Sequence, residues 1–306
     1  MAFKNALKMI ISKFGLMWVI LLYLLITGVL VVSLSLPFAV PLVRTFEEAG
    51  IGKLIAEFFT SFTSGGGVNA WFDKFYAVIL AVKNSILTDK IAAFNTGALV
   101  FFMFIFAYRF ILGLYEIPLV TVLEGAMSSD ARIGFTGRYV SRIGKSCKFV
   151  LVKMIYTVLF DFVIFFALYR MFDLFSVPVL KFFAPFIIMA AVLVMLGIRY
   201  TLIAMWAPDV VLRERGIFKA FGFSVKCAFK HFGSVFSTFL FAWTLIIAVN
   251  MLVGLFTFGA GLILTVPLSL LFVNVLNMTV YYGKNGRRYY TDSATVVTPP
   301  IVEEEK

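Results

Sequence analysis

Residues 231–283 form a run of 53 positions that contains no aspartate, glutamate, lysine or arginine. A membrane-spanning helix needs about 20 mostly apolar residues, so this run is too long for one crossing and long enough for two. Gly254, Gly259 and Gly261 lie near its middle and favour a tight turn. The run therefore predicts two antiparallel spans, over about 233–253 and 262–282.

Four further apolar stretches predict spans over about 15–43, 91–115, 149–169 and 182–206. The first of them is uncharged for 30 residues, which is too long for the apolar part of a signal peptide. Charged residues make up 14% of the chain and hydrophobic ones 62%, whereas about a quarter of an ordinary soluble domain is charged. The sequence predicts an all-α integral membrane protein with six transmembrane helices, with residues 1–290 as one polytopic membrane domain.

The net charge of +11 is explained by membrane topology. Lysine and arginine collect on the cytoplasmic side of membrane proteins. With the N-terminus in the cytoplasm, 20 of the 27 basic residues fall inside and seven outside. We therefore predict that both termini are cytoplasmic, and the positive excess requires no nucleic acid as a partner.

Short basic amphipathic stretches precede the first, third and fifth spans, which suggests three hairpin units. Such helices lie at the level of the lipid headgroups, with their cations near anionic phosphates. Arg109 and Arg199 near the ends of spans two and four are also expected to reach headgroups or to share an anion site. The predicted lipid-headgroup or anion contacts are Arg109, Arg199, Arg138, Arg142, Lys145, Lys219, Lys226 and Lys230.

Two segments lie outside the predicted spans. Apolar residues recur at helical spacing on both sides of Gly65-Gly66-Gly67, so the outer loop 44–90 predicts two amphipathic helices hinged at the glycines. They either lie on the outer leaflet or cap the helix bundle. Residues 291–306 carry little apolar material and end in acidic residues, which predicts a disordered cytoplasmic tail.

The segment from Arg199 to Ser224 carries a recognisable pattern: Arg199-Tyr200-Thr201-Leu202, then Pro208-Asp209-Val210-Val211, then a glycine and a helix from Ile217 to Ser224. This pattern resembles bacterial six-span membrane proteins related to the membrane domain of some glycerophosphodiester phosphodiesterases. The likeness covers about 40 residues and, more faintly, residues 109–149. It implies the six-span fold and the bacterial inner membrane, and it carries over no catalysis because the phosphodiesterase domain has no counterpart here.

Polar residues inside the spans are the candidates for a functional site. Asp161 lies near the middle of the third span, where an acid is expensive and usually faces a partner or water. Asn250, Asn274 and Asn277 lie in spans five and six. We predict an intramembrane polar site made of these four residues. Asp161 acts there on a substrate or proton, or it fixes helix packing through hydrogen bonds.

Catalytic and metal chemistry have little support in the sequence. The chain has two cysteines and one histidine, which argues against a disulfide framework and a His/Cys metal site. No nucleophile and base lie together in the sequence, so we predict a non-enzyme without a metal or cofactor. The sequence favours an accessory or lipid-interacting protein of the bacterial inner membrane, with anionic lipids and a further membrane protein as candidate partners. The alternative is a small-molecule transporter or channel with Asp161 lining the path.

Overall fold

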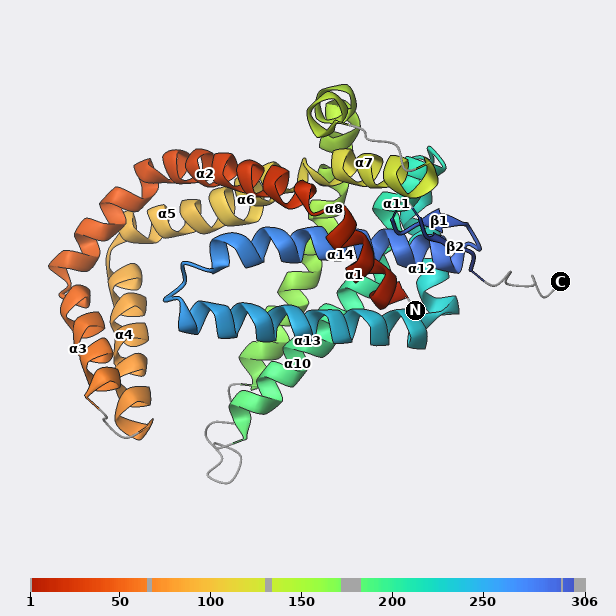
Figure 1. The fold of residues 1–306 in the computed structure, drawn as a ribbon. Coiled ribbons are helices and arrows are strands. Elements are labelled where there is room, and N and C mark those ends of the chain that lie inside the picture. The colour runs from red at the N-terminus through yellow and green to blue at the C-terminus, as the bar shows by residue number, and fades with distance from the viewer. Residues whose placement is uncertain (1, 65–67, 130–133, 172–182, 293, 300–306) are drawn as a thin grey trace. The chain divides into compact units, whose positions relative to one another are not determined.

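The computed structural model describes residues 2–64, 68–129, 134–171, 183–292 and 294–299. Two compact units make up the chain, one of residues 1–25 and 112–306, the other of residues 26–111. Figure 1 shows the helices of each unit.

The first unit contains the following elements: α1 (Ala2–Ser12), α7 (Glu116–Ser129), α8 (Phe135–Met171), α10 (Ala184–Ile203), α11 (Trp206–Leu212), α12 (Ile217–Lys230), α13 (Phe232–Phe256), α14 (Leu262–Lys284), β1 (Tyr289–Tyr290) and β2 (Val296–Val297). Helix α2 (Gly15–Glu48) begins in this unit and continues into the second. The second unit also contains α3 (Ile51–Thr63), α4 (Val68–Thr88), α5 (Lys90–Ala98) and a π-helical segment η1 (Leu99–Ala107). Helix α6 (Tyr108–Gly113) begins in the second unit and ends in the first.

Six helices in the described part of the chain are long and apolar enough to cross a membrane, as the sequence predicts. They are Gly15–Glu48, Lys90–Ser129, Phe135–Met171, Phe186–Leu212, Phe232–Phe256 and Leu262–Lys284. The chain is thus an almost entirely helical membrane protein. Several of these helices extend beyond the predicted spans. The extension of Lys90–Ser129 is largely buried in the protein, whereas that of Phe135–Met171 is the basic stretch, whose residues are mostly exposed or half-buried.

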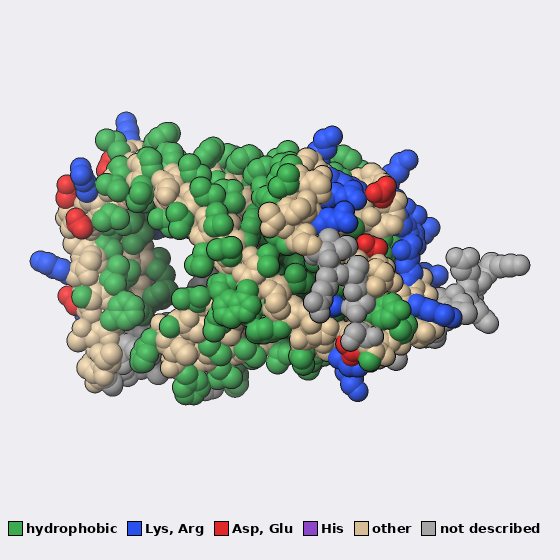
Figure 2. Space-filling model, turned by 45° about the horizontal axis from the view of Figure 1, so that its top comes forward, with side chains coloured by type: hydrophobic (Ala, Val, Ile, Leu, Met, Phe, Trp, Pro, Cys, Tyr) green, Lys and Arg blue, Asp and Glu red, His purple; other side chains and the backbone are tan. Residues whose placement is uncertain are grey.

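The helices differ in how much protein covers them. In the most apolar part of α14, 61% of the residues are buried, against 11–17% in the other five candidate spans. Large apolar side chains cover much of the face drawn in Figure 2. Such an exposed apolar surface is stable in lipid and not in water. Helix α14, in contrast, is surrounded mainly by protein and is the central helix of its unit.

The centre of the first unit is formed by α7, α11 and the second half of α14, which pack on one another. All residues from 271 to 282 of α14 are buried. In α7, Ile117, Leu119 and Leu123 are fully buried. Residues 116–123 of α7 and 206–210 of α11 are also buried, and burial on every face is typical of a helix in a protein core.

Each of these core helices has one basic helix packed against it: α8 on α7, α12 on α11, and α1 on α14. The third pair joins the two ends of the chain, and Phe3 of α1 meets Phe241 and Phe272 edge to face, with ring centroids 4.8 and 5.3 Å apart. Part of the apolar surface of α1 is therefore buried in protein, whereas Leu7 and Ile11 stay exposed. The basic stretch before the third span is continuous with that span, since α8 is one helix of 37 residues.

In the second unit, α3 and α4 occupy the two stretches predicted to be amphipathic, and they lie side by side (Figure 1). Phe58 packs on Phe75 with ring centroids 5.8 Å apart, and Lys74 Nζ lies 2.6 Å from Glu57 Oε2. The ion pair lowers the pKa of Glu57 through the hydrogen bond from Lys74. The glycines 65–67 lie outside the described residues.

The tail differs from its predicted disorder. Tyr289 and Tyr290 pair with Val297 and Val296 in an antiparallel hairpin. Lys8 of α1 fixes this hairpin, because its Nζ lies 2.9 Å from Asp292 Oδ2 and donates to Thr295 Oγ1 at 2.8 Å. The ordered part of the chain therefore extends past residue 290. The tail has few apolar residues of its own, and its contacts with α1 at the other end of the chain stabilise it. Residues 300–306 lie outside the described part.

Candidate functional site

Asp161 lies on α8 and faces α10, where Arg199 Nη1 is 2.5 Å from its Oδ1. The two side chains are 29% and 16% exposed, so the ion pair is largely shielded. The Arg199 guanidinium also lies 5.9 Å from the ring centroid of Tyr200. Arg199, one of the predicted headgroup contacts, is therefore held within the helix bundle by this acid.

A second intramembrane ion pair joins Lys153 of α8 to Glu116 in the first turn of α7. Glu116 is 8% exposed. A carboxylate at this end of a helix is further stabilised by the unpaired N–H groups and the helix dipole. Glu116 is not among the sequence-predicted site residues, although the sequence offered a signal: an acid between Tyr115 and a buried apolar run.

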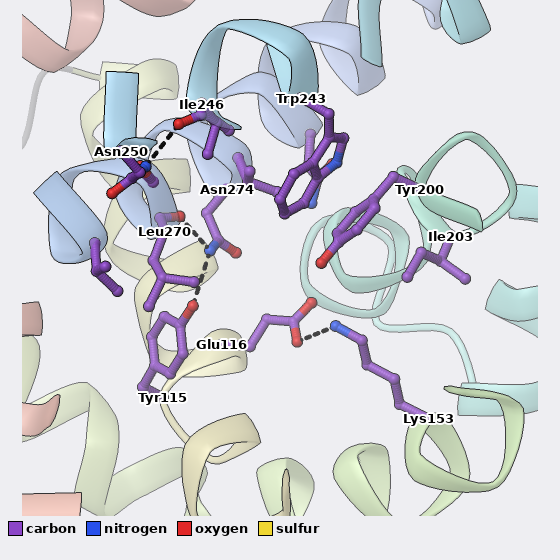
Figure 3. A pocket seen from close by; sticks show the side chains of 14 residues that line it. Tyr115, Glu116, Lys153, Tyr200, Ile203, Trp243, Ile246, Asn250, Leu270 and Asn274 are labelled. Atoms are coloured by element: carbon purple, nitrogen blue, oxygen red, sulfur yellow. Dashed lines mark hydrogen bonds and ion pairs between the residues drawn. The ribbon is translucent and has the colours of Figure 1, made fainter. Parts of the chain in front are cut away.

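The Glu116–Lys153 pair borders a cavity of about 240 Å³ between α7, α8, α10, α13 and α14 (Figure 3). The polar ends of Glu116, Tyr200 and Asn274 point toward the same space. The wall is otherwise mainly apolar. The lining residues are Tyr115, Glu116, Lys153, Tyr200, Ile203, Trp243, Ile246, Asn250, Val266, Ser269, Leu270, Val273, Asn274 and Asn277.

All three predicted asparagines line this cavity, whereas Asp161 is not among the lining residues. The Asn250 side chain joins α13 to α14: its Nδ2 donates to Ser269 Oγ at 3.0 Å, and its Oδ1 accepts from Thr265 Oγ1 at 2.7 Å. Asn274 Nδ2 donates to the Tyr115 hydroxyl at 3.3 Å. The structure thus divides the predicted polar site into a paired acid and an asparagine-lined cavity.

Two buried polar atoms at the cavity have no hydrogen-bond partner in the described part of the chain: Asn277 Oδ1 and Trp243 Nε1. The Asn277 residue is 7% exposed. Buried polar groups in proteins nearly always have a partner, because an unpaired one retains the cost of its lost hydration. Neither atom is accessible to a water molecule, so both lie within the packed wall and not on the cavity surface.

The predicted headgroup contacts on α12 differ from those on α8. Lys219, Lys226 and Lys230 of α12 are all exposed. On α8, Lys145 donates to the backbone oxygen of Val210 at 2.8 Å, and Arg142 Nη2 lies 3.6 Å from Glu214 Oε1. Arg138 is half-buried. Figure 2 shows Lys and Arg side chains gathered at the right, the end at which Figure 1 draws α11 and α12.

Behind these cations lies a buried acid that the sequence reasoning did not select. Asp209 of α11 is 0% exposed; its Oδ1 accepts from the Tyr281 hydroxyl at 3.0 Å. Arg213 Nε lies 3.6 Å from Oδ1, and Arg215 Nη1 lies 3.5 Å from Oδ2. A buried carboxylate with two cations and a hydroxyl is compensated, so Asp209 anchors α11 to α14 and fixes the arginines that follow.

Arg109 lies in α6, within the unit of residues 26–111, and is half-buried. A site shared by Arg109 and Arg199 stays a prediction, because the two residues belong to different units. Among the described residues, no group of three or more His, Cys, Asp or Glu side chains could hold a metal ion. Cys147 and Cys227 are free thiols, and burial raises the pKa of Cys227.

No family model, curated protein or solved structure matches this chain. Two features of the first unit bear on its function. One is the exposed basic face of α12, which can attract anions at a membrane surface. The other is the asparagine-lined cavity, which can hold a polar molecule inside the membrane.

Proposed function

We propose that the protein is a non-catalytic integral membrane protein that binds anionic lipid headgroups with the exposed face of α12. The observation that carries the proposal is the two-sided nature of this helix. Ala220, Ser224 and Ala228 are fully buried on one side. The opposite side exposes Lys219, Lys226 and Lys230 together with Phe218 and Phe229, which are 75% and 68% exposed.

Exposed phenylalanines beside exposed lysines suit a membrane surface, where a layer of charged headgroups lies next to the apolar acyl chains. The rings favour the boundary of the acyl chains, while the ammonium groups favour the phosphates. The buried face explains why α12 holds this position: Ser224 Oγ donates to Leu202 O at 2.7 Å and accepts from Met205 N at 3.2 Å. These bonds fix α12 to the turn between α10 and α11.

The proposed location is a cell membrane, with both termini and α12 on the cytoplasmic side. The distribution of lysine and arginine supports this orientation. The bacterial inner membrane, and kinship with the six-span proteins related to the phosphodiesterase membrane domain, are part of the proposal and are supported by the motif from Arg199 to Ser224. Three basic helices, each paired with one core helix, support the proposed threefold arrangement.

Transport with Asp161 on the path is the second function that the sequence suggests. Asp161 is paired with Arg199 and is not a lining residue of the cavity between α7 and α14. The ion pair supports a packing role for Asp161, and we therefore propose lipid binding ahead of transport. A solute-flux measurement on reconstituted wild-type and Asp161→Asn protein tests the transport reading directly.

The lipid proposal is tested with spin-labelled phosphatidylglycerol and phosphatidylcholine in membranes that contain the protein. We expect the wild type to immobilise more of the anionic lipid. Lys219→Glu/Lys226→Glu/Lys230→Glu should abolish this preference, since each lysine near the surface contributes about 1 kcal/mol. The matched control is Lys53→Glu/Lys83→Glu/Lys90→Glu, which makes the same charge change at exposed positions of the second unit.

In the control variant we expect the preference to persist. Equal immobilisation of the two lipids by the wild type contradicts the proposal. So does loss of the preference in both variants, because net charge alone would then explain it. Repeating the measurement at high salt provides a further check, because screening weakens contacts between exposed charges.

A further inference from the structure

Another hollow, of about 250 Å³, lies between α1, α13, α14 and the tail hairpin. Ser234 is the third residue of α13 and Lys284 is the last residue of α14, so the hollow is at the end of two neighbouring spans. Polar and basic side chains at the ends of spans lie at the level of the lipid headgroups. Ser234 is exposed and Lys284 is half-buried, so both headgroups and dissolved ions can reach this site.

Lys284 carries a positive charge that no acid in the described part of the chain neutralises. Its Nζ donates to Ser234 Oγ at 3.0 Å, and no described carboxylate oxygen lies within 4.0 Å of it. Lys8 and Lys153, in contrast, each have a carboxylate partner. An ammonium group that contacts only a neutral oxygen keeps its attraction for an anion.

The hollow offers hydrogen-bond donors, and its described lining contains no acidic side chain. The Ser234 hydroxyl accepts from Lys284, and its own hydrogen has no acceptor among the residues that the structure describes. Lys284 keeps two further N–H groups. An anion with several oxygen atoms can therefore accept from both side chains at once. The lining residues are Ala2, Ser234, Val235, Thr238, Thr279, Val280, Gly283, Lys284, Tyr289, Val297 and Pro299.

The residues beside the hollow add to its positive potential. Lys230 is the last residue of α12, and His231 joins α12 to α13. After burial, Lys284 and Lys230 are the causes that lower the pKa of His231, because both disfavour a further positive charge nearby. A negative group at Lys284 would be attracted by this potential and would reduce it.

The volume and the wall of the hollow suit a phosphate ester. About 250 Å³ is many times the roughly 15 Å³ that one water molecule requires. A phosphate monoester carries a charge of about −1.5 to −2 and three acceptor oxygens, which match the donors of Lys284 and Ser234. Val235, Val280 and Val297 form an apolar part of the wall, against which the first carbons of an ester can pack.

We propose that this hollow binds a phosphate group, with Lys284 as its counter-charge and Ser234 as a hydrogen-bond donor. The headgroup of an anionic lipid and a free phosphate ion present the same oxygens to these two side chains. The site is separate from the exposed face of α12 and does not depend on lipid binding there.

His231, the single histidine of the chain, serves as the reporter in maltoside micelles, which contain no phosphate. NMR follows its pKa while inorganic phosphate or dihexanoyl phosphatidic acid is added, with sodium chloride at the same ionic strength as the comparison. We expect a saturable rise in the pKa beyond that in chloride, because a bound phosphate offsets the charge of Lys284. The probe that gives half of the rise at the lower concentration identifies the source, a lipid headgroup or free phosphate.

Lys284→Gln should weaken binding of the preferred probe about tenfold, the factor expected for a hydrogen bond to a charged group. Ser234→Ala should weaken it about fivefold, and this variant serves if Lys284→Gln does not fold. Lys230→Gln is the matched control. It removes the other lysine that acts on His231 but not a lining residue, so it should bind the probe almost as the parent does.

Three results would overturn the proposal. The first is a rise in the pKa of His231 no larger than the rise in chloride. The second is unchanged affinity in folded Lys284→Gln or Ser234→Ala. The third is a loss in Lys230→Gln equal to that in Lys284→Gln. This last result would place the phosphate at the end of α12, and the lipid proposal for that helix would stand without this site.

Discussion

Arg199 of α10 forms a salt bridge with Asp161 of α8, with an Nη1–Oδ1 distance of 2.5 Å, and this bridge links two spans. The same helix α8 carries Lys153 two turns earlier, and that residue pairs with Glu116 of α7. Helix α8 is therefore joined to two different neighbours by two pairs of opposite charge. The pairs make the arrangement of these helices specific in a medium where apolar contacts alone discriminate poorly.

Asp161→Asn should destabilise the protein by about 3 kcal/mol, because it leaves the Arg199 charge without its partner in a shielded place. Equilibrium unfolding in mixed micelles measures the loss. The double variant Asp161→Leu/Arg199→Met should lose less than Asp161→Asn alone, since no charge is left unpaired. Arg170→Gln, at an exposed position of the same helix, is the control and should have little effect. If Asp161→Asn lowers the free energy of unfolding no more than Arg170→Gln does, the Asp161–Arg199 pair does not stabilise the protein.

Glu116→Lys should lower the melting temperature in nanodiscs by about 6 °C, because two ammonium groups then face each other at the cavity. Glu116→Lys/Lys153→Glu restores the opposite charges and should recover most of this loss. The recovery will be incomplete, because a lysine replaces the favourable carboxylate in the first turn of α7. If the double variant melts no higher than the single one, the pairing of charges is not what stabilises this contact.

His231 is the single histidine of the chain, so its imidazole can be titrated by NMR without assignment. Burial, Lys284 and Lys230 lower its pKa below the usual 6.5. The unfolded state thus binds the proton more readily, and His231 makes stability fall as pH drops through about 6.5. Lys284→Gln should raise the pKa. Anionic lipid should raise it as well if lipid phosphates approach α12, and an unchanged pKa on adding such lipid would argue against that approach.

Asp292 should control the docking of the tail hairpin on α1. The hydrogen bond from Lys8 is the main cause that lowers the pKa of Asp292 to about 2. Because the folded pKa is below the unfolded value, this contact stabilises docking above about pH 4 and is lost as pH falls toward 2. Asp292→Asn should increase hydrogen exchange at the amide of Ala294, which donates to Asp292 Oδ1 at 2.9 Å. Lys8→Gln should act similarly, whereas Lys4→Gln should not.

The six spans were predictable because they depend on local composition. The uncharged run of residues 231–283 became α13 and α14, with a turn near Gly259, where φ is +88°. Glycine adopts this conformation without steric cost. The asparagines of α13 and α14 were also identifiable, since amides are uncommon in spans and visible in the sequence. Their meeting in one cavity was not predictable, because it depends on which faces of α13 and α14 meet.

The partners of the charged residues could not be read from the sequence. Glu116 and Lys153 are 37 residues apart and Lys8 and Asp292 are separated by nearly the whole chain. The sequence predicted a disordered tail because its composition is polar, and it treated α1 as a membrane-surface helix because it is amphipathic. Distant segments supply contacts that composition does not reveal: α14 packs on one side of α1, and α1 holds the hairpin. The surface position of α1 stays a prediction.

The sequence alone determined that this chain is an all-helical membrane protein, because hydropathy and charge act residue by residue and need no knowledge of neighbours. It also marked the exposed lysines of α12 and the polar residues of the spans. Only the tertiary structure decided that Arg199 neutralises Asp161, that Glu116 pairs with Lys153 beside a cavity, and that the asparagines of α13 and α14 line that cavity. These relations depend on the packing of α7, α8, α10, α13 and α14, because hydrogen bonds and ion pairs form only between atoms that packing has brought within about 3 to 4 Å.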